Sequence, residues 1–518
     1  MHESRRAQRW PLWAAIGLLL SLVAAMLAVG LARTGGRLIY PLDDTYIHMA
    51  VARSLGYHGV WGLTRFSFST SSSSLLWTLV LAAAQRVTLA EWLPLALNLA
   101  AALGLLAGAD RMLVADGWSP RWRAGALAAL ILITPLALTV TLGMEHTLHV
   151  ALTIWLARLA SLDLTGERAV PLWQILLLAA LNSMIRYEGL FLSAAIGLAY
   201  LLQRRWGRMA LIGAAAALPV VVFGLISVSN GWPFLPATLI YKTDLFETSR
   251  FALIPSFANF VPRAVGCFLT SGLALGLMLG FDRASIRRQP VMFHALALGT
   301  LVLHVMYART GWLHRYEAYL IAVNTLALLG TGRLLAPHLL RSARRRWLIA
   351  ALGFGLAAYA GLSIMGMGQI HEAMEDIYRQ HYQMARFATD YFQQGAIGLN
   401  DIGAVAYYTD RPILDFIGLA SRETLAARRL NTASPEVFGQ LAERSGVRLV
   451  MVYDTWMGRY LPPAWPKIGT MSLDYKTIAD SFTVSVYATR EEDVPKLAAA
   501  WRAFAPTLPP AVHAEVLR

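Results

Sequence analysis

The sequence predicts a polytopic α-helical membrane protein with a small α/β domain at its C-terminal end. Of its 518 residues, 57% are hydrophobic and 15% are charged, whereas soluble proteins average about 45–50% apolar and about 25% charged residues. The mean hydropathy is +0.49, and several apolar runs reach roughly 18 residues, the length that crosses a bilayer as a helix. These observations argue against a soluble enzyme.

Eleven apolar segments are expected to cross the membrane. The first follows the basic N-terminal sequence MHESRRAQRW and has no clear cleavage site, so we interpret it as an uncleaved span. The two segments that flank Arg186 are short for a bilayer crossing. The expected spans lie near residues 11–31, 91–109, 124–142, 145–161, 171–185, 188–203, 208–229, 262–281, 291–308, 316–335 and 347–367.

The positive charge indicates how these spans are oriented. The net charge is +14, from 45 basic and 31 acidic residues, and arginines cluster between the apolar runs, as in cytoplasmic loops. Five arginine-rich clusters can be counted, one in the N-terminal sequence and four between later apolar runs. All five fall on the cytoplasmic side only if the apolar run Ser73–Leu89 does not cross the membrane. We therefore expect this run to form a juxtamembrane helix in the first outer loop. The alternative is a twelfth span with one basic loop on the opposite side.

This topology divides the chain into two expected domains. Residues 1–367 would form the transmembrane catalytic domain, with a cytoplasmic N-terminus. Residues 368–518 would form an extracytoplasmic domain, because their composition is more polar and short strand-like runs alternate with helical ones. Cys267 is the only cysteine, which excludes an intramolecular disulfide and a zinc site built from cysteines.

The first outer loop contains two adjacent carboxylates, Asp43 and Asp44. Neighbouring carboxylates can supply a general base, because like charge raises one pKa, or can hold a divalent cation. They can also simply favour the N-terminal end of a helix expected over residues 45–57.

Other charged residues lie in the outer segments between later spans. Glu145 precedes the fourth span and could instead interact with that helix dipole. Arg186 and Glu188 could instead form a buried pair that stabilises a helix break. Lys242 is the only lysine before Lys467, and a compact ammonium there suits a phosphate, although chance would also explain it. Arg315 lies in the outer segment YARTGWLHRYE.

Several of these segments resemble one family in the same order along the chain. LDDTYIHMAVARSLGYHGVWG and FSFSTSSSSLLWT are similar to the first outer loop of the C-type glycosyltransferase superfamily, particularly its arabinofuranosyltransferase-like bacterial members. TLGMEHTL, IRYEG, FLPATLIYK, HRYEAYL and DIGAVAYYTDRPILDFIGL resemble later segments. Tyr187 and Ala237 depart from the family pattern, where proline and asparagine are usual.

The resemblance implies a function and roles for particular residues. The protein would transfer a sugar from a polyprenyl-phosphate-linked donor to a glycan, lipid or cell-envelope polymer outside the cytoplasm. Asp43 or Asp44 would be the general base, and Glu145 would position the acceptor or help these aspartates to hold a divalent cation as the cofactor. The donor and its phosphate would be bound by five residues: Tyr46, Arg186, Glu188, Lys242 and Arg315.

Two other classes of function compete with this one. A transporter or flippase of lipid-linked sugars would also place charge within the membrane, but its charges would be spread through the bilayer and on both faces. A structural protein that presents the outer domain would need no paired carboxylates. The expected location is a bacterial inner or plasma membrane, with no nucleic-acid partner.

Overall fold

The computed structural model describes residues 9–242, 272, 288–308, 311, 313–339 and 346–518. The chain divides into two compact units, each built from separated segments. The first comprises Met1–Met26, Leu95–Phe223 and Glu247–Gly368, and the second comprises Leu27–Pro94, Gly224–Phe246 and Gln369–Arg518. The second unit therefore resumes next to the expected domain start at residue 368. It also includes the first outer loop and residues 224–246, which belong to the transmembrane domain expected from the sequence.

The first unit is helical. Its helices, with α2 that begins in it, are α2 (Trp10–Arg33), α5 (Leu93–Ala115), α6 (Pro120–Ile133), α7 (Leu136–Thr141), α8 (His146–Thr165), α9 (Leu172–Ile185), α10 (Gly189–Leu202), α11 (Trp206–Ser229), α14 (Arg288–Tyr307), α15 (Ala318–Leu339) and α16 (Arg346–Gly368). Each expected span within the described residues coincides with a helix, or with the pair α6 and α7. The expected span 262–281 lies outside the described residues.

Among the described helices, five are long and apolar enough to cross a membrane: α2, α5, α8, α11 and α14. The helices α9 and α10 have 14 residues each and are shorter than a usual span, as their sequence indicated. A polytopic helical protein is thus confirmed, while the number of crossings stays a prediction.

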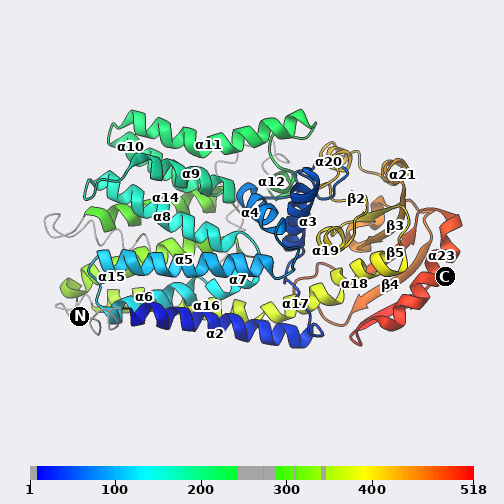
Figure 1. Cartoon of the computed structure of the whole chain (residues 1–518), viewed down its shortest axis with the longest axis horizontal. Helices are drawn as coiled ribbons and strands as arrows, with labels where there is room; N and C mark the ends of the chain where they lie inside the picture. Colours follow the sequence, from blue (N-terminus) through cyan, green and yellow to red (C-terminus); the bar gives the residue numbers. More distant parts are fainter. Residues whose placement is uncertain (1–8, 243–271, 273–287, 309–310, 312, 340–345) are drawn as a thin grey trace. The chain divides into compact units, whose positions relative to one another are not determined.

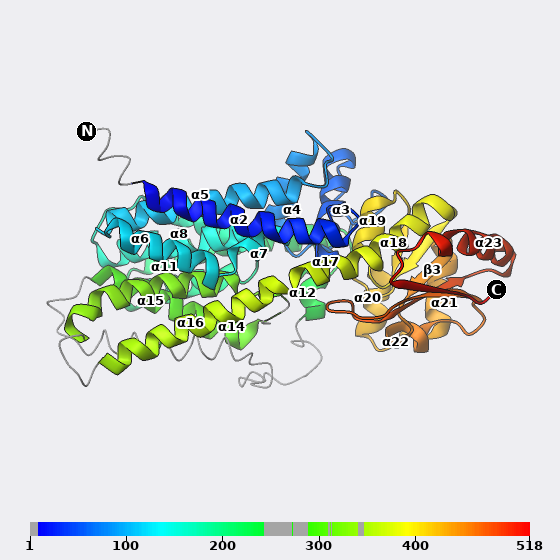
Figure 2. The same cartoon turned by 90° about the horizontal axis from the view of Figure 1, so that it is seen from below.

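Helix α8 lies at the centre of this unit. It packs against α9, α14 and α15, and the long helices run side by side (Figures 1 and 2). The most apolar stretch of α8 is 78% buried, whereas that of α11 is 22% buried. A residue at the start of α8, such as Glu145, is therefore held within the packed interior.

The second unit begins with the helices of the first outer loop. Helix α3 (Asp43–His58) starts at the aspartate pair and ends at Gly59, whose φ of 69° is a left-handed conformation that glycine adopts without strain. Helix α4 (Leu75–Gln85) starts where the Ser74 hydroxyl accepts a hydrogen bond from the Trp77 N–H. Its 11 residues rise about 16 Å, roughly half the hydrocarbon core, which supports a helix that does not cross.

The remaining elements of this unit form the α/β part. The helical elements are α12 (Ala237–Lys242), α17 (Ile370–Arg379), α18 (His381–Arg386), η4 (Phe387–Tyr391), α19 (Gly403–Tyr408), α20 (Arg422–Arg429), α21 (Pro435–Arg444), α22 (Asp454–Met457), η5 (Gly458–Tyr460), η6 (Glu491–Asp493), α23 (Val494–Phe504) and η7 (Ala505–Thr507). The strands are β1 (Ala396–Leu399), β2 (Ile413–Asp415), β3 (Val447–Val452), β4 (Lys467–Leu473), β5 (Thr483–Ala488) and β6 (Val512–Val516).

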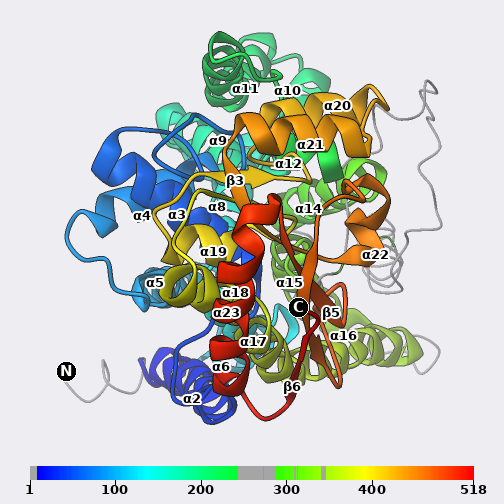
Figure 3. The same cartoon turned by 90° about the vertical axis from the view of Figure 1, so that its right-hand side faces the viewer.

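The six strands form one mixed sheet in the order β2-β1-β3-β5-β4-β6. The pairs β2–β1 and β1–β3 are parallel, and the other three pairs are antiparallel. Helices α20 and α21 lie together beside β3, while α23 packs on β4 (Figure 3). The core between α21 and the sheet is built around Phe416 and Phe438, whose rings stack with centroids 5.4 Å apart. The small C-terminal α/β domain expected from the sequence is thus confirmed.

Candidate active site

Asp43 is held by the N-terminal end of another helix. Its Oδ2 accepts a hydrogen bond from the Gly403 N–H (2.6 Å), and its Oδ1 accepts one from the Ala404 N–H (2.8 Å). A Cβ on Gly403 would lie 2.1 Å from the Asp43 carbonyl oxygen, so this close approach requires glycine. Asp43 therefore begins α3 while its side chain caps α19, and it is not the N-cap of its own helix, which is Leu42.

His381 lies between Asp43 and a second carboxylate, Asp401. Its Nδ1 is 3.5 Å from Asp43 Oδ1, and its Nε2 is 3.4 Å from Asp401 Oδ2. Burial lowers the pKa of His381, but the hydrogen bond with Asp401 and the charge of Asp43 outweigh it and raise the pKa to about 9. His381 is thus an imidazolium at neutral pH, flanked by two carboxylates.

The Asp43 carboxyl is itself poised near neutral pH. Burial raises its pKa, and although the His381 charge and the two backbone hydrogen bonds oppose this, the pKa is about 6. The side chain is only 12% exposed. A carboxylate with these properties binds a proton more readily than an ordinary surface aspartate.

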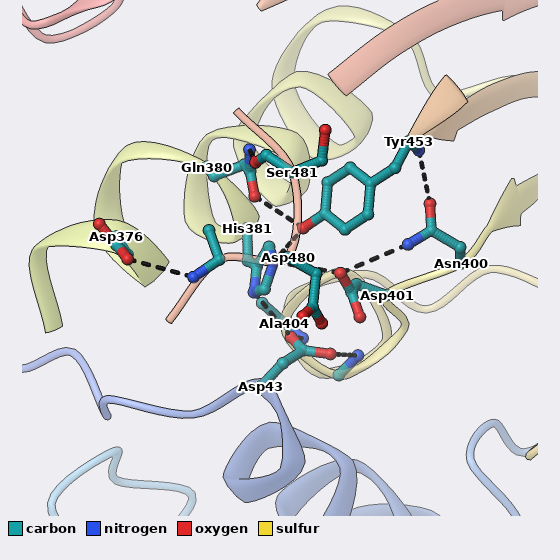
Figure 4. Close-up of polar contacts among 12 residues, drawn as sticks. Asp43, Asp376, Gln380, His381, Asn400, Asp401, Ala404, Tyr453, Asp480 and Ser481 are labelled. Carbon is teal, nitrogen blue, oxygen red and sulfur yellow. Dashed lines mark hydrogen bonds and ion pairs between the residues drawn. The ribbon is translucent and has the colours of Figure 1, made fainter. Parts of the chain in front are cut away.

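A hydrogen-bonded chain fixes the other side of His381 (Figure 4). His381 Nε2 donates to the Tyr453 hydroxyl (2.8 Å), which donates to Gln380 Oε1 (2.6 Å). Asn400 accepts from the Tyr453 backbone N–H (2.8 Å), which ties the end of β3 to the turn after β1. We call Asp43, His381, Asp401, Tyr453 and Gln380 the histidine cluster.

The histidine cluster combines segments that are far apart in the sequence. It joins the start of α3, the α17–α18 junction, the turn after β1 and the end of β3. Asp376 of α17 adds support, because its Oδ2 accepts from the backbone N–H groups of Thr477 and Ile478, both at 2.7 Å. Asp44, the next residue of α3, is half-buried and contributes to the electrostatic environment of Asp480.

The first unit contains a different charged cluster, formed by Glu145, Arg186 and Glu188. Arg186 Nη1 donates to Glu145 Oε1 (2.7 Å), and its Nη2 and Nε donate to the two oxygens of Glu188 (2.6 and 3.2 Å). Arg186 ends α9, and its extended backbone, with φ −155° and ψ 144°, forms the break before α10. We call these residues the arginine triad. Its geometry matches the alternative in which a buried ion pair stabilises the helix break.

Arg315 lies in the same unit and shares an aromatic neighbour with the triad. The guanidinium groups of Arg186 and Arg315 lie 5.4 and 4.8 Å from the centroid of the Tyr316 ring. Arg315 also donates to the Tyr316 hydroxyl (3.0 Å) and to Met144 Sδ (3.1 Å). The structure thus brings together four predicted site residues: Glu145 and Glu188 are bonded to Arg186, and Arg186 and Arg315 share the Tyr316 ring.

Two other residues that were predicted to bind the sugar donor lie in the second unit. Tyr46 is 1% exposed, its hydroxyl accepts from the Tyr40 N–H (3.1 Å), and its ring packs near Tyr407 and Tyr408. The structure gives Tyr46 a packing role, and its contact with a donor stays a prediction. Lys242 ends α12, but its side chain lies outside the described part of the chain.

Three residues of the histidine cluster, His381, Tyr453 and Asp401, were not predicted as site residues from the sequence. Asp401 begins the segment DIGAVAYY that resembled the family, which was the only available signal, whereas His381 and Tyr453 stand in no motif. Among the described residues, no group of three or more His, Cys, Asp or Glu side chains is arranged to hold a metal ion. A cation at Asp43, Asp44 and Glu145 therefore stays a prediction.

Part of the chain matches a protein family, and its fold matches a solved structure. Residues 370–487 match a family described only as a domain of unknown function, DUF8728. No curated protein matches the chain. The structure is similar to the crystal structure of ArnT from Cupriavidus metallidurans in the apo state, with a TM-score of 0.53 and 15% sequence identity, over 94% of this chain and 99% of that one.

ArnT is a glycosyltransferase of the C-type superfamily. Because 94% of this chain is covered, the likeness extends over both units. At this level of identity the comparison concerns the fold alone. The polytopic helical fold with a small C-terminal α/β part, which the resembling segments imply, is confirmed.

Proposed function

We propose that this protein is a membrane glycosyltransferase that moves a sugar from a polyprenyl-phosphate-linked donor to an acceptor outside the cytoplasm. The shared fold with ArnT supports the class of enzyme, and the motif resemblance supports the class of donor. The sugar can be a hexose or a pentose. The arrangement of Asp43 is the observation that carries the chemical proposal.

Asp43 acts as the general base in this proposal. Two backbone N–H groups and His381 orient its carboxylate, and each oxygen still has a lone pair that can accept a proton. A pKa of about 6 is near the value at which a base is both ionised and effective at neutral pH. Asp44 is the second carboxylate of the loop and the alternative base.

The proposed reaction is a substitution at the anomeric carbon of the donor sugar. The acceptor hydroxyl oxygen forms a bond to this carbon while the bond to the phosphate oxygen breaks. Asp43 takes the hydroxyl proton, and the polyprenyl phosphate leaves with the electron pair. Cationic groups directed at the departing phosphate lower the barrier for such a step.

We assign the departing phosphate to Arg315 and Lys242. Arg186 is already bonded to Glu145 and Glu188, so we propose that it positions the loop and Tyr316 instead of binding phosphate directly. Glu145 is fully buried and bonded to Arg186. A direct contact between Glu145 and an acceptor would require this ion pair to open.

A membrane assay with a panel of polyprenyl-phosphate sugars tests the proposal. Asp43→Asn is expected to abolish transfer while the protein level persists, because asparagine keeps one acceptor for α19 but cannot take the proton. Asp474→Asn is the matched control, since Asp474 pairs with His513 on the surface. Size-exclusion chromatography checks that both variants fold.

The outcomes separate the parts of the proposal. Full activity of Asp43→Asn with an inactive Asp44→Asn would assign the base to Asp44. Full activity of both variants would exclude a first-loop base. Failure of every donor with the unaltered protein would contradict the glycosyltransferase function and favour transport.

A further inference from the structure

A cavity in the α/β part of the second unit is lined by residues outside the histidine cluster. It has a volume of about 430 Å³ and is bordered by α22, η5, α20 and the end of α12. Cavities that bind small ligands generally range over about 300–1,000 Å³. Its size therefore suits a sugar-sized group.

The lining of this cavity combines aromatic rings with arginines. Tyr241, Trp456 and Tyr460 provide the rings, and Arg428 and Arg459 provide two guanidinium groups. Trp456 and Tyr460 pack against the core formed by α21 and the sheet. The fold itself therefore holds these rings in place.

The hydrogen-bond partners of both arginines are neutral groups. Arg428 donates to the Phe416 carbonyl (2.8 Å) and to Met457 Sδ (3.2 Å), while Arg459 donates to the Tyr460 hydroxyl (2.6 Å). Their guanidinium groups lie 5.1 and 4.6 Å from the centroid of the Tyr460 ring. Within the described residues, neither arginine forms an ion pair with a carboxylate.

The neighbouring acid does not neutralise these charges. Asp454, at the start of α22, accepts hydrogen bonds from Lys467 (2.6 Å), Tyr487 (2.7 Å) and Ser485 (2.7 Å). By contrast, Arg448 of the same sheet is paired with Asp493. Among the described residues that line the cavity, the two arginines are the charged ones, and they lie next to aromatic ring faces.

The cavity also borders the histidine cluster. The Trp456 ring packs edge-on against Tyr453, with centroids 5.6 Å apart and planes at 89°. Tyr453 in turn accepts the hydrogen bond from His381. One aromatic side chain therefore separates the cavity from the proposed catalytic cluster.

We propose that this cavity binds an anionic saccharide, a sugar unit carrying a phosphate or a carboxylate, as part of the acceptor. This inference rests on the proposed transfer function. Guanidinium groups bind phosphate and carboxylate oxygens in a planar, two-point geometry, and the aromatic faces offer apolar surface to the sugar ring. A neutral sugar would leave both arginines without an anion.

The test is calorimetric titration of the purified full chain in detergent micelles. The probes are tetragalacturonate and glucose 6-phosphate as anionic saccharides, maltotetraose as a neutral saccharide of matched length, and inorganic phosphate. We expect binding of the two anionic saccharides, and no comparable binding of maltotetraose or phosphate. Equal binding of maltotetraose would overturn the charge requirement, and equal binding of phosphate would overturn the saccharide requirement.

Variants connect this binding to the cavity. Arg459→Gln is expected to weaken Kd about tenfold, because it removes one charge-assisted contact, and Trp456→Leu should also weaken it. Arg444→Gln, an exposed arginine of α21, is the matched control and should leave Kd unchanged. Unchanged binding in Arg459→Gln would overturn the proposed site.

Two further measurements are needed. One distinguishes a saccharide from a lipid headgroup as the source of the anion, and the other distinguishes the binding proposal from the proposed transfer function. Binding to phosphatidylglycerol vesicles that depends on Arg459 would identify a lipid headgroup and overturn the saccharide assignment. Asp43→Asn should bind the anionic saccharides as well as the unaltered protein does. If no donor supports transfer but Arg459-dependent binding persists, the transfer function fails while the cavity remains a saccharide site.

Discussion

The arginine triad and the histidine cluster both hold carboxylates in buried surroundings, but with different cations. In the triad, Arg186 stays charged at every physiological pH and bonds two glutamates directly. In the histidine cluster, the cation is His381, whose charge depends on pH and on Asp43 and Asp401. We infer that the triad serves a fixed geometry, whereas the histidine cluster can respond to proton transfer.

The sequence origin of the two clusters also differs. Two members of the triad are two residues apart, at the break between α9 and α10. The histidine cluster joins α3, α18 and the turns after β1 and β3. The geometry of the histidine cluster therefore depends on the packing of the α/β part. The geometry of the triad depends more on the local break between α9 and α10.

The largest expected effect is loss of the triad cation. Arg186→Leu would leave Glu145 and Glu188 without their partner, and breaking a buried ion pair in this way costs about 3–5 kcal/mol. We expect a strongly lowered Tm in detergent and a low yield of folded protein. Thermal unfolding followed by size-exclusion chromatography measures both.

A triple variant sharpens this prediction. Replacing Glu145, Arg186 and Glu188 together by Leu, Met and Met removes the charges without leaving one unpaired, and such replacements are often neutral for stability. The triple variant should therefore be more stable than Arg186→Leu alone. A cost under about 1 kcal/mol for Arg186→Leu would contradict the buried ion pairs.

A smaller effect is expected at the contact between α3 and α19. Gly403→Ala would place a Cβ 2.1 Å from the Asp43 carbonyl oxygen, so the backbone has to move and the two hydrogen bonds to Asp43 weaken. Forced overpacking of this kind costs about 1–3 kcal/mol. Denaturant unfolding measures the loss.

Gly458→Ala is the matched control for this variant. Its Cβ would meet Asp454 Cβ at 3.9 Å, an ordinary contact, and the backbone there is helical, with φ −51° and ψ −39°. We expect its stability to be almost unchanged. If both alanine variants unfold at the same denaturant concentration, the close approach of α19 to Asp43 is not important for stability.

An effect of about the same size is expected from the pH dependence of the histidine cluster. The pKa of His381 rises from 6.5 to about 9 on folding, so the folded state binds the proton more tightly. Its contribution to stability is complete below pH 6.5 and is lost as the pH rises to 9. The free energy of unfolding should fall by about 1–3 kcal/mol over this interval.

The matched variant for this measurement is His381→Gln. It keeps a polar side chain but removes the titrating imidazole, so the part of the fall between pH 6.5 and 9 that His381 causes should disappear. Loss of the His381 charge also raises the pKa of Asp43 above about 6, so the double variant His381→Gln/Asp43→Asn completes the comparison by removing that second titration. An equal fall in the variant would show that another group is responsible.

Much of the helical fold could be predicted from the sequence. Expected spans such as 145–161 and 208–229 match α8 (His146–Thr165) and α11 (Trp206–Ser229), because a bilayer requires long apolar runs that are visible locally. The aspartate pair was also recognisable, since Asp43 and Asp44 are adjacent. The short helix α4 followed from the balance of arginines between the two sides of the membrane.

The partners of these residues could not be predicted in the same way. His381 and Tyr453 become neighbours of Asp43 only after the sheet and α19 have formed, across more than 300 residues of sequence. The sequence also suggested that Tyr46 binds the sugar donor. In the structure, the rings of Tyr40 and Tyr408 pack around Tyr46. Such contacts depend on long-range packing, which a local pattern does not contain.

The sequence by itself therefore determined the membrane class, the expected spans and the presence of acids in the first outer loop. Hydrophobic length and charge bias are properties of short segments, so they need no tertiary information. Only the tertiary structure decided that Asp43 caps α19 beside His381, that Arg186 is neutralised by two glutamates, and that Arg428 and Arg459 face one cavity. The physical reason is that burial, charge pairing and proton affinity depend on which distant residues exclude water together.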